Sequence, residues 1–255
     1  MLKTLTLKVV AAAVMGSGLL ALGTTPAYAS VEEGVALLKA QKYADAMQVF
    51  KVEAARDNTE ALYMIGEMLA QGLGQKPAPL EATYWWEKGA YLGDEKCILT
   101  VSEAYRTGFG VRVDPRQALV WDRQAAKLGS AAAYKNLGDY FVKGFGVEKD
   151  TTEAAKWYVR SAAKGHPAGE VALAALLRDG EGVEKDVVSA WVLFNAAAHP
   201  GAGVEPDRNA AAEARLLGHT LSESDLKRAQ STKVADVIAK EADALKVNLE
   251  EKMPK

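Results

Sequence analysis

The sequence has very little of the chemistry that usually marks a disulfide scaffold or a metalloprotein. Its 255 residues include one cysteine, Cys97, and three histidines, His166, His199 and His219. A single thiol cannot form a disulfide within its own chain, so packing alone must hold the fold together. The histidines do not stand at helical or hairpin metal-ligand spacings, and no H-E-x-x-H motif is present. We therefore expect no metal and no cofactor, and we interpret Cys97 as an apolar filler of the core.

An excess of charge of either sign is also missing. The formal net charge is -2, and charged residues of both signs make up 25% of the chain. This balance does not favour nucleic acid or an anionic membrane surface as a partner.

Long hydrophobic runs are absent as well. The longest, over residues 9–23, has about 15 residues, fewer than the roughly 20 needed to span a bilayer. Lys3 and Lys8 flank its start, and the small residues Ala27 and Ala29 follow it, which is the pattern of a secretory signal peptide over residues 1–29. A membrane anchor is the alternative. We expect Sec-type export, cleavage after Ala29, a periplasmic or secreted mature protein, and no stable membrane insertion afterwards.

Residues in strict register are what the chain does contain. Four columns recur with a step of 36 residues. They are Gly72, Gly108, Gly144 and Gly180; Gly74, Gly110, Gly146 and Gly182; Ala46, Ala82, Ala118, Ala154 and Ala190; and Gly93, Gly129, Gly165 and Gly201. Independent columns that share one period predict an array of repeated units.

Each unit reads as two helices. Ala133, Leu137 and Phe141 follow the i, i+4, i+8 spacing of one helical face, and the segment 151–165 shows a similar apolar face. Small residues alternate with large ones, which lets neighbouring helices approach closely. No single pair can bury both of its faces, so neighbouring units must supply the missing contacts.

The segment GFGVRVD at 108–114 returns as GFGVEKD at 144–150 and as GEGVEKD at 180–186. A phosphate-binding loop would follow a strand and occupy one special position, whereas these segments follow helices and recur in every unit. We interpret each as the turn between two helices. Its first glycine ends one helix in the left-handed conformation, and Asp150, with Glu153 three residues later, begins the next.

Three segments carry a family resemblance: YWWEKGAYLG (84–93), VWDRQAAKLG (120–129) and KWYVRSAAKG (156–165), each followed by a helix and a Gly-x-Gly turn. They resemble the Sel1-like repeat, a branch of the tetratricopeptide superfamily, over roughly residues 44–201. The resemblance implies an all-α fold, a right-handed α-α superhelix of about five helix pairs. The first unit departs from the pattern, because only 32 residues separate Gly34 from Gly66 and AQKY replaces the long turn.

We divide the chain into a signal peptide (1–29), the repeat array (30–201) and a C-terminal helical cap (202–255). The period is lost after residue 201. One short helix is expected within residues 204–220, and a second helix that begins with Thr220 and Glu223 as a capping box. The apolar positions of this second helix are Leu226, Val234, Val237, Ile238, Leu245 and Leu249. A separate partner-binding helix is the alternative interpretation of the cap.

One motif suggests catalysis. Ser161 and Lys164 form an S-x-x-K sequence, and some exported relatives of this repeat family are linked to penicillin binding. Ser161, however, occupies a column held by Gly89 and Ala125, and neither S-D-N nor K-T-G occurs in the chain. We therefore expect no enzyme activity, and a hydrolase of cell-wall peptide or β-lactam remains the alternative.

The resemblance also implies a binding surface, because the first helix of each unit lines the concave side of such superhelices. By register, the residues that face a protein or peptide partner are Tyr63, Glu67, Leu99, Glu103, Arg106, Lys135, Asp139, Val142, Val171, Ala175 and Arg178. Trp85, Trp86, Trp121, Trp157 and Trp191 fall on second helices and are interpreted as core.

We expect an exported, non-catalytic protein–protein interaction module that acts as an adaptor or scaffold of a bacterial envelope process. Exported relatives suggest two other roles, an immunity protein that neutralises a secreted toxin in the periplasm and a host-directed factor.

Overall fold

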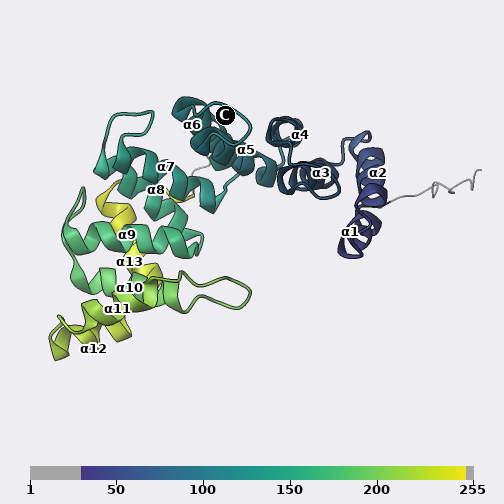
Figure 1. The fold of residues 1–255 in the computed structure, drawn as a ribbon. Coiled ribbons are helices and arrows are strands. Elements are labelled where there is room, and N and C mark those ends of the chain that lie inside the picture. Colours follow the sequence, from purple (N-terminus) through teal and green to yellow (C-terminus); the bar gives the residue numbers. More distant parts are fainter. Residues whose placement is uncertain (1–29, 251–255) are drawn as a thin grey trace, which may run out of the picture.

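A computed structural model describes residues 30–250, so the predicted signal peptide lies outside the described residues. These residues form thirteen helices and no strand (Figure 1). The helices are α1 (Val31–Lys39), α2 (Tyr43–Ala54), α3 (Thr59–Gln71), α4 (Pro79–Tyr91), α5 (Glu95–Thr107), α6 (Pro115–Lys127), α7 (Ala131–Lys143), α8 (Thr151–Ala163), α9 (Pro167–Asp179), α10 (Val187–Ala198), α11 (Ala210–Gly218), α12 (Glu223–Ser231) and α13 (Val234–Ala244).

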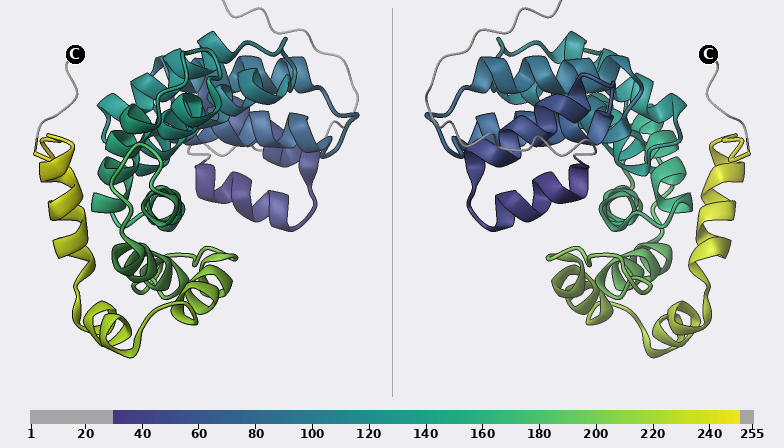
Figure 2. Two further views of the ribbon diagram at one scale, coloured as in Figure 1. Left: turned by 90° about the vertical axis from the view of Figure 1, so that its left-hand side faces the viewer. Right: turned by 90° about the vertical axis from the view of Figure 1, so that its right-hand side faces the viewer.

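The helices α1 to α10 form five antiparallel pairs, as the 36-residue period predicts. Each helix packs against the one before it and the one after it, and the pairs follow a curved path that forms an open arch (Figures 1 and 2). The first helices of neighbouring units also contact one another directly, α3 with α5 and α7 with α9. First helices therefore lie on the inner side of the arch, and second helices lie on the outer side.

The glycine columns end the first helices in the predicted way. Gly144 closes α7 in the left-handed conformation with φ 66°, and its N–H donates to the Tyr140 carbonyl. The second glycine of each turn lies close to the preceding unit. A Cβ atom on Gly110 would collide with the carbonyl group of Pro79. The turn thus connects two helices and also packs against the start of an earlier second helix.

Side chains at the helix starts satisfy the free backbone N–H groups. Asp114 caps α6 and Asp150 caps α8, each through its carboxylate. Asn58, Asp94 and Ser130 cap the first helices α3, α5 and α7. At α9 the equivalent residue is His166, whose side chain makes no capping hydrogen bond.

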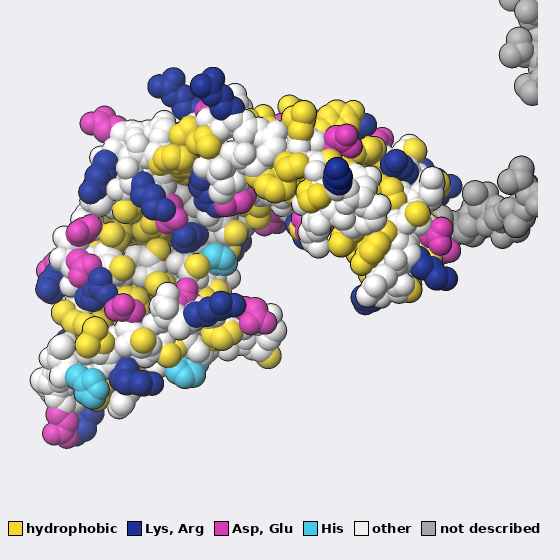
Figure 3. Space-filling model, viewed as in Figure 1, with side chains coloured by type: hydrophobic (Ala, Val, Ile, Leu, Met, Phe, Trp, Pro, Cys, Tyr) yellow, Lys and Arg dark blue, Asp and Glu magenta, His cyan; other side chains and the backbone are white. Residues whose placement is uncertain are grey.

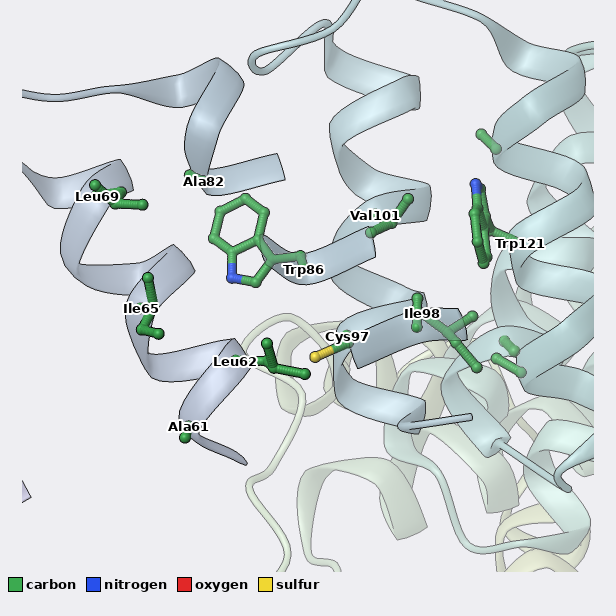
Figure 4. Close-up of a cluster of buried hydrophobic side chains, with 14 of the residues drawn as sticks. Ala61, Leu62, Ile65, Leu69, Ala82, Trp86, Cys97, Ile98, Val101 and Trp121 are labelled. Carbon is green, nitrogen blue, oxygen red and sulfur yellow. The ribbon is translucent and has the colours of Figure 1, made fainter. Parts of the chain in front are cut away.

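Large rings on second helices pack over small residues on first helices. Trp86 covers Gly66, Tyr158 covers Gly138, and at both glycines a Cβ atom would collide with the ring. Figure 4 shows Trp86 beside Ile65 of α3 and Val101 of α5. This interlocking of rings and glycines sets how closely the helices of a unit approach.

Cys97 is fully buried and contacts Leu62 in this cluster (Figure 4). Burial raises the pKa of its thiol well above the usual range. The interpretation of Cys97 as a filler of the core is confirmed.

The tryptophan expectation holds in part. Trp86 and Trp121 are buried, whereas Trp85, Trp157 and Trp191 are half-buried. Trp157 stacks on Tyr134 with ring centroids 6.0 Å apart.

The predicted single helix from Thr220 onward is wrong in two respects. Ser222, not Thr220, caps the helix by accepting the N–H of Asp225. The segment is also two helices, α12 and α13. The hydroxyl groups of Ser231 and Thr232 both donate to the Arg228 carbonyl, and this local bonding competes with continued helix.

The chain end turns back along the array. α11 and α12 pack on α10, and α13 then runs over the outer side of α8 and α10 (Figure 2). Val237 and Ile238 belong to the same buried cluster as Val159 of α8. Lys240 Nζ lies 2.6 Å from Asp186 Oδ2, which ties α13 to the start of α10.

Candidate functional site

Two grooves open side by side where successive first helices meet. The first, the apolar groove, has a volume of about 270 Å³ and is lined by Ala70, Trp86, Thr100, Glu103, Ala104, Thr107 and Phe109. The second, the basic groove, has a volume of about 230 Å³ and is lined by Arg106, Lys135, Asn136, Asp139, Tyr140, Lys143 and Phe145. Figure 3 shows the underside of the arch as a hollowed surface with hydrophobic side chains beside acidic and basic ones.

The two grooves are the same feature of the repeat. A step of 36 residues takes Ala70 to Arg106, Thr100 to Asn136, Glu103 to Asp139, Ala104 to Tyr140, Thr107 to Lys143 and Phe109 to Phe145. The architecture therefore opens this hollow in consecutive units, and the side chains in it decide what each hollow can bind.

One second-helix column, which lies behind the hollows, changes from aromatic to acidic between units. Trp86 lines the apolar groove, and Tyr158 and Phe194 hold its column in later units. In the unit between them, the column holds Asp122. A buried carboxylate thus replaces an aromatic ring, and Ser102 replaces the glycine that such a ring covers.

Asp122 is fully buried and fully hydrogen-bonded. Its Oδ2 accepts from Ser102 Oγ at 2.6 Å and from Tyr140 Oη at 2.9 Å, and its Oδ1 accepts from Asn136 Nδ2 at 3.0 Å. Burial raises the pKa of this carboxyl group, while the three hydrogen bonds and the nearby Arg106 oppose the rise. Asn136 and Tyr140 belong to the wall of the basic groove, so Asp122 fixes the position of that wall.

Ion pairs organise the charges around the basic groove. Lys135 Nζ lies 2.7 Å from Asp139 Oδ2, and Lys143 Nζ lies 3.9 Å from the same oxygen. Tyr158 Oη donates to the other oxygen, Oδ1, at 2.9 Å. Arg106 pairs with Glu103 of the neighbouring groove. Three cations thus line the basic groove against one carboxylate.

None of the eleven residues predicted for the inner face is buried, and four of them line the grooves. Glu103 belongs to the apolar groove, and Arg106, Lys135 and Asp139 belong to the basic groove. The structure therefore brings together the central part of the predicted set. That these residues bind a partner stays a prediction.

The other predicted residues lie outside the two grooves. Tyr63 lies beneath the Lys96 ammonium, 3.8 Å from its ring centroid, and Glu67 accepts a hydrogen bond from Gln71. Leu99, Val142, Val171 and Ala175 are half-buried against the core. Arg178 donates to Glu213 at 2.8 Å and also pairs with Asp179, so its guanidinium holds α9 to α11.

The S-x-x-K motif does not form an accessible nucleophile. Ser161 is fully buried, and its hydroxyl donates to the Ala131 carbonyl at 2.7 Å. His166 Nδ1 lies 3.3 Å from Ser161 Oγ, and burial lowers the pKa of this histidine. Lys164 is exposed at the end of α8. Ser161 therefore fills the small packing position that its column predicts.

Several residues of the grooves and their walls were not predicted. Ala70, Thr107 and Lys143 lie near the ends of first helices, Phe109 lies in the turn that follows α5, and Asp122 lies on the second helix α6. The signal for Asp122 was present in the sequence, since a single acid interrupts a column of aromatic residues.

Among residues 30–250, no three His, Cys, Asp or Glu side chains come together as a metal site requires. None of the helices described is both long enough and apolar enough to cross a membrane.

Comparison with known proteins supports this reading of the fold. The sequence matches the Sel1 repeat over residues 59–94, 101–130, 131–166, 167–199 and 193–213. The structure is similar to the crystal structure of a Sel1 repeat protein from Oxalobacter formigenes, with 27% identity, a TM-score of 0.64, and coverage of 86% of this chain and 85% of the other.

A second similar structure is a protective antigen of uropathogenic Escherichia coli strains that displays an SLR fold. It shows 22% identity and a TM-score of 0.48, and the match covers 89% of this chain and 58% of that protein. Among curated proteins, none matches the sequence significantly. Since the matched repeats span more than half of the sequence and follow its helix pairs, the chain belongs to the Sel1 repeat family, a family of protein–protein interaction modules.

Proposed function

We propose that the protein binds a partner polypeptide along the inner face of the arch and acts as a non-catalytic adaptor or scaffold. The observation that carries this proposal is the pair of repeat-equivalent grooves between first helices. Hollows that recur along one face suit a ligand that is itself extended, because each unit can contact a successive part of it.

The chemistry of the face also supports binding. The grooves combine aromatic, aliphatic and charged side chains, a mixture that is common where proteins recognise peptides. The catalytic alternative loses its main support, because the Ser161 hydroxyl is buried and bonded to backbone.

The proposal places this binding outside the cytoplasm. Residues 1–29 have the pattern of a cleaved secretory signal, which supports action in the periplasm or beyond as part of an envelope process.

Site-specific photocrosslinking in cells tests the proposed face. A photoreactive phenylalanine analogue is introduced at Thr107 or Lys143, one exposed residue from each groove, and at Lys164 or Leu216, which are exposed elsewhere. We expect the same crosslinked partner from both groove positions and none from the two control positions. Equal crosslinking from all four positions, or crosslinking from the controls alone, would contradict the proposal.

A further inference from the structure

We infer that the ligand of the two grooves is a peptide in an extended, polyproline-type conformation that carries an apolar residue and an acidic residue about three positions apart. This inference rests on the proposed function and names the chemistry of its partner.

The apolar groove accepts a hydrophobic side chain. Trp86, Ala70, Ala104 and Phe109 supply apolar surface, and Glu103 is the one charged residue in the lining. The Trp86 indole N–H is already used, because it donates to the Tyr63 carbonyl at 3.3 Å. The groove therefore presents apolar surface and no free ring donor to an incoming side chain, which favours an aliphatic or aromatic residue.

The basic groove accepts a carboxylate. Lys135 and Arg106 already have acidic neighbours, whereas the Lys143 side chain is 70% exposed and its ammonium lies 3.9 Å from Asp139. Asp139 itself is held by Tyr158 and Lys135. A ligand carboxylate would find cations within reach and little competing negative charge, while a ligand cation would meet three like charges.

The repeat fixes the distance between the two subsites. Equivalent points in adjacent units are separated by about one helix spacing, of the order of 10 Å. In a polyproline II segment, residues i and i+3 project to the same side and lie about 9 Å apart. In a β-strand, residues on one face lie about 7 Å or 13 Å apart, which fits less well. Of these conformations, the polyproline II segment matches the expected spacing most closely.

Synthetic peptides test the inference directly. Fluorescein-labelled, proline-rich peptides carry one leucine and one glutamate at every separation up to about six residues, in both orders. A matched series has lysine in place of glutamate. Fluorescence anisotropy with the mature protein measures affinity. We expect one order of the glutamate series to bind best at a separation of three, about fivefold or more tighter than at adjacent positions or in the lysine series.

Two variants assign the subsites, and a third serves as the control. Lys143→Glu should weaken binding of the glutamate peptide and strengthen binding of the lysine peptide. Thr107→Glu, which places a charge in the apolar groove, should weaken both. Lys164→Glu makes the same charge reversal as Lys143→Glu at an exposed site outside the grooves and should change the binding of neither peptide.

Affinity that does not depend on separation or charge would overturn the inference, and so would the absence of binding by any peptide at about 1 mM. Either result would leave the crosslinking result standing, so a failure of the ligand motif is distinguishable from a failure of the proposed binding face.

Discussion

Single residues decide what this array can do, because the repeat supplies equivalent positions that differ only in their side chains. Where Asp122 replaces an aromatic ring, the neighbouring wall becomes polar and the groove in front of it carries cations. Where Trp86 keeps the ring, the groove is apolar. Asp122 makes the wall polar, and Arg106 and Lys143, which stand where the apolar groove has Ala70 and Thr107, supply positive charge.

Glu170 is a second acid in an apolar column. Its equivalents are Leu62, Ile98 and Tyr134, all buried, and Glu170 itself is only 6% exposed. Burial raises the pKa of its carboxyl group to about 7 from an ordinary value of 4.5. The folded protein therefore binds this proton more tightly than the unfolded chain does, and its contribution to stability falls as pH rises from about 4.5 to about 7.

We predict that Glu170→Leu removes the fall in stability that accompanies the rise in pH. Near pH 5 the variant and the wild type should be similar in stability, and near pH 8 the variant should be more stable by up to about 3 kcal/mol. Urea unfolding at both pH values measures the difference. The explanation fails if the variant keeps the wild-type dependence of stability on pH.

Both acids illustrate the limits of sequence at the residue scale. A comparison of columns identifies Asp122 and Glu170 as exceptions, as it identified Ser161 as a packing residue. It does not reveal how each exception is satisfied, because Asn136 and Tyr140, which bond Asp122, come from the following unit.

At the scale of helices, boundaries inside the array were predictable and those beyond it were not. A glycine ends each long-turn helix, and an aspartate caps the next helix in three of the four turns, the exception being α4, which starts at Pro79 after Ala78. In the C-terminal segment, the apolar spacing of Val234, Val237 and Ile238 continues a helical pattern through a real break. At that break the hydroxyl groups of Ser231 and Thr232 donate to the Arg228 carbonyl, and such local bonding leaves no periodic signal in the sequence.

Replacement by alanine should destabilise the protein less at the first glycine of a turn, such as Gly144, than at the second glycine of a turn, such as Gly110. At Gly144 the nearest atom to a new Cβ is 3.5 Å away, so Gly144→Ala should cost only the left-handed strain, about 1 kcal/mol. At Gly110 the new Cβ would also collide with backbone of Pro79, so Gly110→Ala should cost at least about 2–3 kcal/mol.

Urea unfolding of the two variants, with similar m-values, measures these costs. Equal destabilisation would show that the contact between the turn and the preceding unit is not rigid.

For the whole molecule, the 36-residue register predicted an array of two-helix units, and the family resemblance implied about five helix pairs with the first helices on the inner side. The path of α13 could not be predicted, because its contacts with α8 and α10 join segments far apart in the sequence. Its apolar face was visible in the sequence, but the surface that it covers was not.

Removal of residues 232–255 should therefore weaken the C-terminal half selectively. The helices α8 and α10 would lose their contacts with α13, and the free energy of their local opening should fall by roughly 3 kcal/mol. Hydrogen exchange read by mass spectrometry should show faster exchange there and unchanged exchange in α3 to α6. Uniformly faster exchange would instead indicate that the chain unfolds as one unit.

The return of α13 gives the arch two mechanically different ends. Each unit between α3 and α7 is joined only to its neighbours, so a pull on the chain would separate those units one after another, as the turns of a spring open. Beyond α8 the same pull would first have to detach α13 from α8 and α10. We therefore expect the N-terminal units to separate at lower force than the units that α13 holds together.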